Sequence, residues 1–589
     1  MEAKSYFQDR LHKNEVELKR ISKLSLLLSM MRLAVFLVVA AIVYFFWGNA
    51  MVMASSIVVG IALFLLLVSR YTDAKAQKAY HAALKKLNED ELKALEGNFS
   101  MFQNGKEFLF DAHHFNQDID LFGDGSFFQR INRTGTQKGK EKLAQLLNAN
   151  DVEHIEEKQR AVKELAEMAD WRQNYQVTAS LMTAESESRR VVNWLKNYEA
   201  IIPNTFKYIP LLFSLGSLAV LVLYGIGKIP GIGVGFWMII GLNVTGIYLK
   251  KINKLSRNAS DAKEILYQYG KLIAEIEQQK FEAQSLNELK KGLETEGKTA
   301  SDVLKQLSKE IGNLDQRNNM LIAIFLNGFL LWDLRYTYRI EKWITAFDEA
   351  IEKWFEVVEH FDAQNSLGNM AFTHAQYIYP VISPEKDEVL IAERLGHPLL
   401  KSEKRVDNDI HVADGNFFII TGANMAGKST FLRTVALNLV MANCGLPVCA
   451  KRYEYRPIKL ISSMRTSDSL QNDESYFFSE LKRLKFIVDE LEKDTYFIIL
   501  DEILKGTNSK DKAEGSQKFV ERLVASGSTG LIATHDLSLC TLADQYPKVE
   551  NHYFDAEIIN DELHFDYTFK VGICKNMNAS FLLKKMQIV

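Results

Sequence analysis

Thr421–Thr430 reads TGANMAGKST and directly follows the apolar run Phe417 to Ile420. The stretch contains the pattern G-x-x-x-x-G-K-[ST] between a predicted strand and a predicted helix, which is typical of a phosphate-binding P-loop. Glycines let the backbone N–H groups turn toward phosphate oxygens, and the following helix points its positive end at them. The ten residues therefore predict a nucleotide site in an α/β domain with a mostly parallel sheet.

The residue types of this loop match the tasks of nucleotide binding. Lys428 is predicted to reach the β- and γ-phosphates, and Ser429 is predicted to ligate Mg²⁺. ATP and Mg²⁺ are therefore the expected cofactors. The predicted nucleotide-binding residues are Gly422, Ala423, Asn424, Met425, Ala426, Gly427, Lys428, Ser429 and Thr430.

A matching second half of the site lies downstream. The run Phe497 to Leu500 is typical of a buried strand, and it ends in Asp501 and Glu502. We expect Asp501 to hold Mg²⁺ and Glu502 to polarise the attacking water as general base. His535 follows another predicted strand, where we expect it to sense the γ-phosphate, although a lone histidine is more often structural. The predicted catalytic residues are thus Lys428, Glu502 and His535.

Size and composition bound the remaining possibilities. A chain of 589 residues is too long for one core, so we expect three or four units. The net charge of −3 gives no strongly basic footprint for nucleic-acid binding. The four cysteines have neither C-x-x-C pairs nor histidines at zinc spacing, which favours reduced cysteines packed in a cytosolic domain.

Long uncharged stretches predict membrane spans. Leu33 to Ser69 carries no charged side chain and as a helix would be about 55 Å long, nearly twice a ~30 Å hydrocarbon core. It therefore predicts two spans joined near Gly48, and a second pair follows at 208–227 and 230–249. The shorter run Met320 to Trp332 contains Asn327 and Gly328, and we expect it to pack in a soluble core.

Basic residues flank the outer ends of both predicted hairpins, for example Arg32, Arg70, Lys207 and Lys250. By the positive-inside rule these ends are cytoplasmic. The expected location is the inner or cytoplasmic membrane, multi-pass, with the ATPase domain in the cytoplasm and the lipid bilayer as a partner.

These patterns predict a mixed fold, in which helical transmembrane hairpins and an all-α lever or core region precede an α/β P-loop ATPase domain of the ABC type. Residues 1–202 and 231–379 contain no proline, which favours helices. Apolar positions between 252 and 317 predict long amphipathic helices, either packed on neighbours or forming a coiled-coil arm. Strands are expected near 389–392, 416–421, 458–463, 496–501 and 529–534.

The expected divisions are 1–80 (first hairpin, spans about 30–47 and 53–69), 81–204 (first core part), 205–250 (second hairpin), 251–371 (second core part) and 372–589 (ATPase domain).

Several motifs resemble the MutS family of DNA mismatch-repair ATPases. The P-loop contains that family's N-M-x-G-K-[ST] core, and Asp501-Glu502-Ile503 with Gly506-Thr507 is similar to its D-E-I-x-x-G-T run. Further similar segments are Gly396-His397-Pro398, with glycine where arginine is usual, Asn408-Asp409-Ile410 and Ala533-Thr534-His535. The resemblance covers about residues 390–540 and is weaker over 108–200 and 251–370, where Gly125 to Gly139 resembles the entry to the family's helical core.

The resemblance implies a dimer whose subunits complete each other's sites. The family's serine that acts in trans matches Ser475, which the resemblance therefore adds to the nucleotide-binding residues. Two neighbours differ from the family pattern, because Asp473 stands where a glycine is usual and Glu474 where a basic residue is usual. A homodimer is expected, and DNA is a partner by resemblance alone.

The expected function is that of a membrane-anchored MutS-like ATPase whose helical arms act on DNA, mismatched or branched. Membrane hairpins occupy the place where the family carries its mismatch-reading domain and its DNA-clamping tip, so we expect that domain to be absent. Because the sequence ends at Val589, we also expect the family's larger C-terminal dimerisation module to be absent. The alternative is an ATP-driven, transporter-like membrane protein with no DNA role. Against it, the chain has no L-S-G-G-Q signature, and its predicted spans carry no acid or base at mid-membrane depth.

Overall fold

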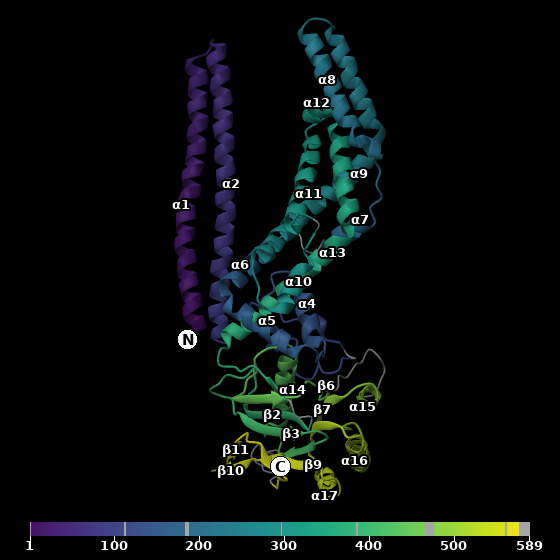
Figure 1. The fold of residues 1–589 in the computed structure, drawn as a ribbon. Helices are drawn as coiled ribbons and strands as arrows, with labels where there is room; N and C mark the ends of the chain where they lie inside the picture. Colours follow the sequence, from purple (N-terminus) through teal and green to yellow (C-terminus); the bar gives the residue numbers. More distant parts are fainter. Residues whose placement is uncertain are drawn as a thin grey trace.

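Two tall helical columns rise from a mixed α/β base (Figure 1). The computed structural model describes residues 2–110, 113–182, 188–295, 297–383, 387–465, 476–559 and 562–575. The N-terminal two thirds of the described chain is helical, and the strands follow in the C-terminal part. The coarse prediction of a helical region before an α/β region is confirmed.

The first column is a hairpin of two long helices, α1 (Glu2–Phe45) and α2 (Ala50–Leu95). Its turn contains Gly48 at a φ of +106°, and the Asn49 side chain caps α2 by accepting from the N–H of Val52. Buried residues of α1 recur every seven positions (Phe7, Asn14, Ile21, Leu28) and meet a similar series on α2 (Gly60, Leu67, Ala74). A seven-residue spacing of this kind is the seam of an antiparallel coiled coil.

The second column contains α8 (Ile209–Gly225), α9 (Gly231–Gln278), α11 (Ala300–Leu314), α12 (Met320–Leu330) and α13 (Trp332–Thr373). The apolar residues of the predicted amphipathic stretch, such as Ile265, Leu272 and Ile276, are buried against neighbouring helices of the same chain. The interpretation as helices packed on their neighbours is therefore correct for this stretch.

Shorter helices complete the helical part. They are α3 (Phe127–Ile131), α4 (Gln137–Asn148), α5 (Ile155–Glu167), α6 (Ala169–Ser180), α7 (Ser188–Lys196) and α10 (Gln284–Lys291).

The base is built on a six-stranded sheet of order β12-β9-β4-β8-β7-β6. All its neighbouring pairs are parallel except β12 with β9. Its strands are β4 (Phe417–Gly422), β6 (Lys459–Ser463), β7 (Tyr496–Asp501), β8 (Thr529–Ala533), β9 (Val549–Phe554) and β12 (Lys570–Val571). The sheet is flanked by α14 (Lys428–Asn443), α15 (Tyr476–Leu491), α16 (Ser509–Ala525) and α17 (Leu542–Gln545).

A second sheet of order β1-β5-β2-β3 packs beside the first, and β10 pairs with β11. Their bounds are β1 (Val381–Ile382), β2 (Glu388–Leu395), β3 (Asn408–Ala413), β5 (Arg452–Tyr455), β10 (Glu557–Ile559) and β11 (Glu562–His564). Strands occur at all five predicted places, because β2, β4, β6, β7 and β8 overlap the predicted ranges.

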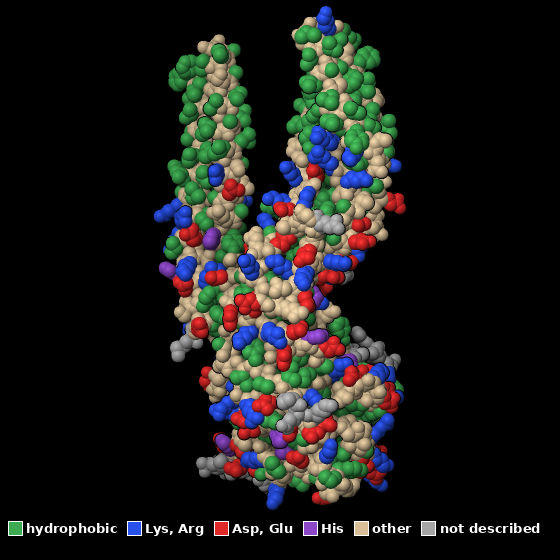
Figure 2. Space-filling view, viewed as in Figure 1, with side chains coloured by type: hydrophobic (Ala, Val, Ile, Leu, Met, Phe, Trp, Pro, Cys, Tyr) green, Lys and Arg blue, Asp and Glu red, His purple; other side chains and the backbone are tan. Residues whose placement is uncertain are grey.

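Three described helices, α1, α2 and α9, are long and apolar enough to cross a bilayer, judged by length and composition. The third expected span corresponds to α8, which is apolar but has only 17 residues. Apolar side chains cover the upper parts of both columns (Figure 2).

The expectation for Met320 to Trp332 was wrong. This run forms α12 and the start of α13, and the two helices meet at a bend of 81°. Met320, Leu321 and Phe325 are 76%, 75% and 64% exposed, so α12 does not pack inside a soluble core. Only Asn327 and Gly328, near the end of α12, are buried. The length of the apolar run could not show which of its residues would be buried.

The helical part and the α/β part share one apolar core. Phe115 and Leu143 from the helical part lie in the same cluster as Val435 and Leu439 of α14 and Phe418 of β4. The P-loop helix α14 therefore packs directly against the helices that lead to the columns.

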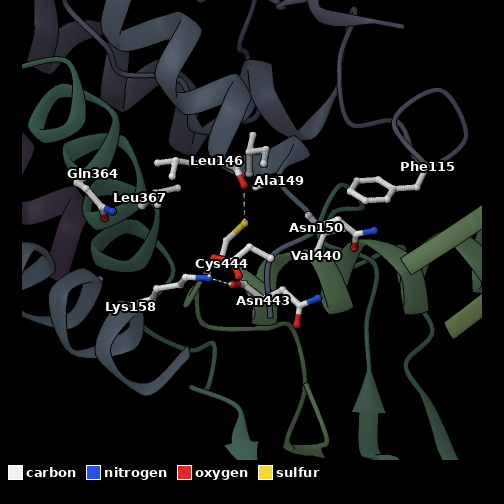
Figure 3. A pocket seen from close by; sticks show the side chains of 12 residues that line it. Phe115, Leu146, Ala149, Asn150, Lys158, Gln364, Leu367, Val440, Asn443 and Cys444 are labelled. Carbon is white, nitrogen blue, oxygen red and sulfur yellow. Dashed lines mark hydrogen bonds and ion pairs between the residues drawn. The ribbon is translucent and has the colours of Figure 1, made fainter. Parts of the chain in front are cut away.

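The C-terminal end of α14 lies beside a small cavity of about 70 Å³ (Figure 3). Lys158 of α5 donates from Nζ to the carbonyl of Asn443 at 3.3 Å, and the Cys444 thiol donates to the carbonyl of Leu146 at 3.6 Å. A cation at this end of a helix is favourable because the last carbonyls carry partial negative charge. The junction of α4 and α5 is thus fastened to the C-terminal end of the P-loop helix.

A buried ion pair fastens the first column to the core. Arg133 donates to both carboxylate oxygens of Glu91 at 2.6 and 3.2 Å, and Asn369 of α13 donates to the same carboxylate at 3.0 Å. The Arg133 and Glu91 side chains are only 4% and 2% exposed. Removing one charge would leave the other buried and unpaired.

We therefore expect Glu91→Gln to destabilise the protein by about 3 kcal/mol, measured as a lower midpoint of thermal unfolding in detergent. The matched control is Glu89→Gln on the same helix, whose partner Lys85 lies at 3.6 Å near the surface. It should change stability by less than about 1 kcal/mol. Equal midpoints for the two variants would contradict this reading of the ion pair.

Candidate nucleotide-binding site

Three neighbouring strands bring the predicted segments together. β8 lies between β4 and β7 and is parallel to both. The P-loop follows β4, Asp501 ends β7 and His535 comes two residues after β8. Because the carboxyl ends of parallel strands meet at one edge of a sheet, these side chains gather at that edge.

The backbone of the loop requires glycine at two places. Gly427 has a φ of +105° directly before α14, and Gly422 has a φ of +153° at the end of β4. A Cβ added to Gly422 would lie 2.6 Å from the carbonyl oxygen of Phe554 on β9. The loop therefore passes too close to β9 for a side chain, and it turns so that α14 begins at Lys428 with its N-terminal end at the site.

A cavity of about 530 Å³ opens at this edge. Of the predicted residues, those from Ala423 to Thr430 line it together with Asp501, Glu502 and His535. Gly422 does not line the cavity but shapes the loop. Ser475 lies outside the described residues, as do Asp473 and Glu474.

Lys428 is buried in the loop that precedes it. Its Nζ donates to the carbonyls of Gly422 at 2.8 Å and Ala423 at 3.1 Å, and it lies 3.2 Å from Nε2 of His535. Burial lowers the pKa of Lys428, although the charges of Asp501 and Glu502 oppose this shift. The ammonium group is thus held at the centre of the loop, where a phosphate oxygen would replace the carbonyls.

Glu502 is held by two lysines. Its carboxylate accepts from Lys512 of α16 at 2.9 Å, and Nζ of Lys505 lies at 3.7 Å. Burial acts to raise the pKa of Glu502, but the hydrogen bond and charge of Lys512, with the charges of Lys505 and His535, hold it below its usual value. The carboxylate therefore stays ionised, as a group that polarises water must.

His535 faces Lys428 from the end of β8. Burial and the nearby Lys428 charge lower the pKa of its imidazole, while Glu502 acts to raise it. A neutral imidazole can both accept and donate hydrogen bonds in the cavity.

Ser429 and Asp501 both line the cavity and offer oxygen atoms, which Mg²⁺ prefers. No cluster of three or more acidic, histidine or cysteine side chains suited to a metal occurs among the described residues. A serine and one carboxylate fit Mg²⁺ in a site where phosphates and water supply the remaining ligands, so the donor set suits a nucleotide-bound ion.

The lining of the cavity also contains Tyr567, which no motif singled out, and Asn408. Tyr567 lines it at a φ of +52°, and its ring lies next to Gly427. Asn408 holds this segment, because its amide donates to the carbonyl of Tyr567 at 3.0 Å and accepts from the N–H of Phe569 at 2.8 Å. Asn408 belongs to a motif quoted above, whereas no sequence signal marks Tyr567.

Two further side chains position the loop after β7. Lys512 lies ten residues beyond Glu502 in the sequence, and the start of α16 brings its side chain back to the Glu502 carboxylate. Glu480 of α15 accepts from the N–H of Lys505 at 2.9 Å and is buried. Neither could be assigned from spacing, because each contact depends on how a helix returns to the sheet.

Comparisons with known proteins point to the same segment. The sequence profile of MutS domain V matches residues 418–585. The chain is 30% identical over 242 residues to the human protein "MutS protein homolog 4", a match that covers 38% of this chain and 26% of that protein. It is 31% identical over 207 residues to "DNA mismatch repair protein MutS" of Thermotoga neapolitana, covering 34% of this chain and 25% of that protein. The chain thus spans about a quarter of the length of these curated relatives.

Lys428→Met tests the site as a phosphate cradle. Because charge-assisted hydrogen bonds contribute about 1.5–3 kcal/mol, we expect the variant to bind a fluorescent ATP analogue at least roughly tenfold more weakly. The control is Lys518→Met on the exposed face of α16, which should bind like the unmodified protein. Equal affinities for the Lys428 and Lys518 variants would exclude this cavity as the nucleotide site.

Proposed function

We propose that this chain is a membrane-anchored ATPase of the MutS family. One observation supports the proposal most. The P-loop, the Asp501-Glu502 pair and His535 surround one cavity within the segment that matches MutS domain V. In this proposal the chain binds and hydrolyses ATP, and hydrolysis moves the helical columns.

The roles of the residues follow from their positions. Lys428 would bind β- and γ-phosphate oxygens, and Ser429 and Asp501 would hold Mg²⁺, which supplies charge neutralisation of the phosphates when bound. Glu502 would take up the proton of the attacking water, and His535 would contact the γ-phosphate beside Lys428. Lys512 and Lys505 would keep Glu502 ionised until that proton arrives.

We propose that both columns enter the cytoplasmic membrane and that the base lies in the cytoplasm. The exposed apolar upper parts of α1, α2, α8 and α9 support the anchor, and basic residues at their lower ends support the orientation. The proposed division of the chain is 1–80 for the first hairpin, 81–204 and 251–371 for the helical core, 205–250 for the second hairpin and 372–589 for the ATPase domain.

Movement would pass from the site to the membrane through two helices. α14 begins in the cavity and shares its core with the helical part, where α13 runs from the core to the second column. At 42 residues, α13 is about 63 Å long. A small rotation of its lower end would therefore be amplified at its upper end.

We further propose a homodimer in which Ser475 of each subunit completes the other's site, as the family resemblance implies. DNA as a partner rests on the family alone, since the relatives named for mismatch repair share only about a quarter of their length with this chain. The alternative is an ATP-driven membrane protein with no DNA role, which would use the same apolar helices as its membrane part.

Glu502→Gln tests hydrolysis separately from binding. The amide cannot accept the proton of water, so we expect ATP binding to persist while hydrolysis falls about 100-fold or more. Light scattering of the detergent-solubilised variant with ATP should show whether a dimer accumulates. Glu514→Gln, exposed on α16, is the control and should hydrolyse ATP normally. Normal hydrolysis by the Glu502 variant would remove Glu502 from the role of base.

A salt-dependent DNA titration separates the two functions. The ATPase rate of the solubilised protein would be measured with duplex, branched and mismatched DNA at about 50 mM and 200 mM salt. If DNA is bound through phosphate contacts, stimulation should appear at low salt and weaken at high salt. No binding and no stimulation at low salt would reject DNA and leave the membrane-only alternative.

A further inference from the structure

The helix α12 lies in the upper part of the second column and exposes apolar side chains. Met320, Leu321, Ile322 and Phe325 are all exposed. The helix packs on α8 and α9, and Figure 1 shows it lying beside them. The proposed membrane spans already include α8 and the first part of α9. The height of α12 along these two helices therefore decides whether lipid or water surrounds it.

Two contacts place the end of α12 near the middle of these spans. A Cβ on Gly241 would lie 2.5 Å from the carbonyl oxygen of Gly328, so the two backbones touch. Gly241 lies ten residues, or about 15 Å, below the start of α9, whose apolar part ends near Leu249 after about 28 Å. From α8, the hydroxyl of Ser217 donates to the carbonyl of Phe329 at 2.6 Å, and Ser217 is the ninth of that helix's 17 residues.

The residues before α12 mark the lower limit. Arg317 donates to Asn253 of α9 at 2.5 Å, just beyond Lys250 and Lys251. Asn319 then caps α12 by accepting from the N–H of Ile322 at 3.3 Å. The helix is therefore bracketed between the middle of the proposed spans and the basic residues at their cytoplasmic end, where lipid head groups would lie.

The bend between α12 and α13 is covered by protein. Besides the Ser217 contact, the side chain of Asn327 accepts from the N–H of Asp333 at 2.9 Å, and Arg317 pairs with Asp333 at 3.1 Å. Trp237 in turn donates to Ser217 at 2.8 Å. Broken helices occur at membrane depth only where protein satisfies their backbone groups, and these contacts meet that condition.

We propose that α12 lies in the cytoplasmic leaflet without crossing the bilayer, and that Met320, Leu321 and Phe325 contact lipid acyl chains. The inference rests on the proposed membrane anchor and adds to it. It means that α13, the helix leading to the ATPase base, starts inside the membrane. The lever is then fastened to the bilayer at its upper end as well as through the hairpin.

Spin-label accessibility tests the proposal in full-length protein reconstituted into vesicles of phosphatidylcholine and phosphatidylglycerol. A ketone-bearing amino acid at Phe325 carries the nitroxide, so the four native cysteines stay unchanged. Leu215 on α8 reports the anchor and Leu537 reports the base, since both are exposed. We expect labels at Phe325 and Leu215 to collide with oxygen more than with a nickel chelate, and the label at Leu537 to show the reverse.

The outcomes separate the inference from the anchor. Lipid exposure at Leu215 with water exposure at Phe325 would overturn the placement of α12 and leave the anchor intact. Water exposure at both positions would overturn the anchor itself. A label at Phe325 shielded from both reagents would show that protein, such as a second copy, covers α12, and would also overturn the proposal. A label at Leu321, which is 75% exposed, repeats the test at a second position.

Discussion

The packing of α14 between the two halves of the protein is the constraint on which the other features depend. Its first residue, Lys428, lies in the nucleotide cavity, and side chains such as Val435, Ala436 and Leu439 lie in the core shared with the helical part. Each fully buried large apolar side chain contributes about 1.5–3 kcal/mol. The helix cannot slide against this core without losing several such contributions. A displacement at the P-loop would therefore carry the adjacent helices with it.

A buried carboxylate reinforces this joint. Asp362 of α13 accepts from the N–H groups of Gly135 and Thr136 and from the hydroxyl of Thr136, which caps α4. A Cβ on Gly139 would lie 2.1 Å from the Asp362 carboxylate, so glycine is required for this approach. Burial raises the pKa of Asp362 to about 6, against the effect of these hydrogen bonds. The glycine and threonine pattern that resembles the family's core entry thus has a physical purpose, which is to seat α4 on α13.

The features that could be predicted from the sequence are those set by a few neighbouring residues. The strand β4 followed by the P-loop, and the strand β7 ending at Asp501, were identified because glycine spacing and apolar runs act over a few residues. Lys512 at Glu502 and Tyr567 at Gly427 could not be predicted, because both contacts join segments whose approach depends on tertiary packing. The environment of α12 was predicted wrongly for a related reason. Its sequence is apolar except for Asn327 and Gly328, and apolarity does not distinguish a protein core from exposure beside α8 and α9.

The two columns meet the core at nearly the same place. The first is held by Glu91, which pairs with Arg133, and the second continues into α13, whose Asn369 donates to the same carboxylate. Arg133 also donates from its backbone to Ser366 of α13 at 3.0 Å. Because a buried charge must keep its partners, the lower ends of the columns cannot separate at this point without leaving Glu91 unpaired. Any change in the distance between the columns must then come from rotation about the contact between Glu91, Arg133 and Asn369. The upper ends of the columns would move furthest, because their helices are some 60 Å long.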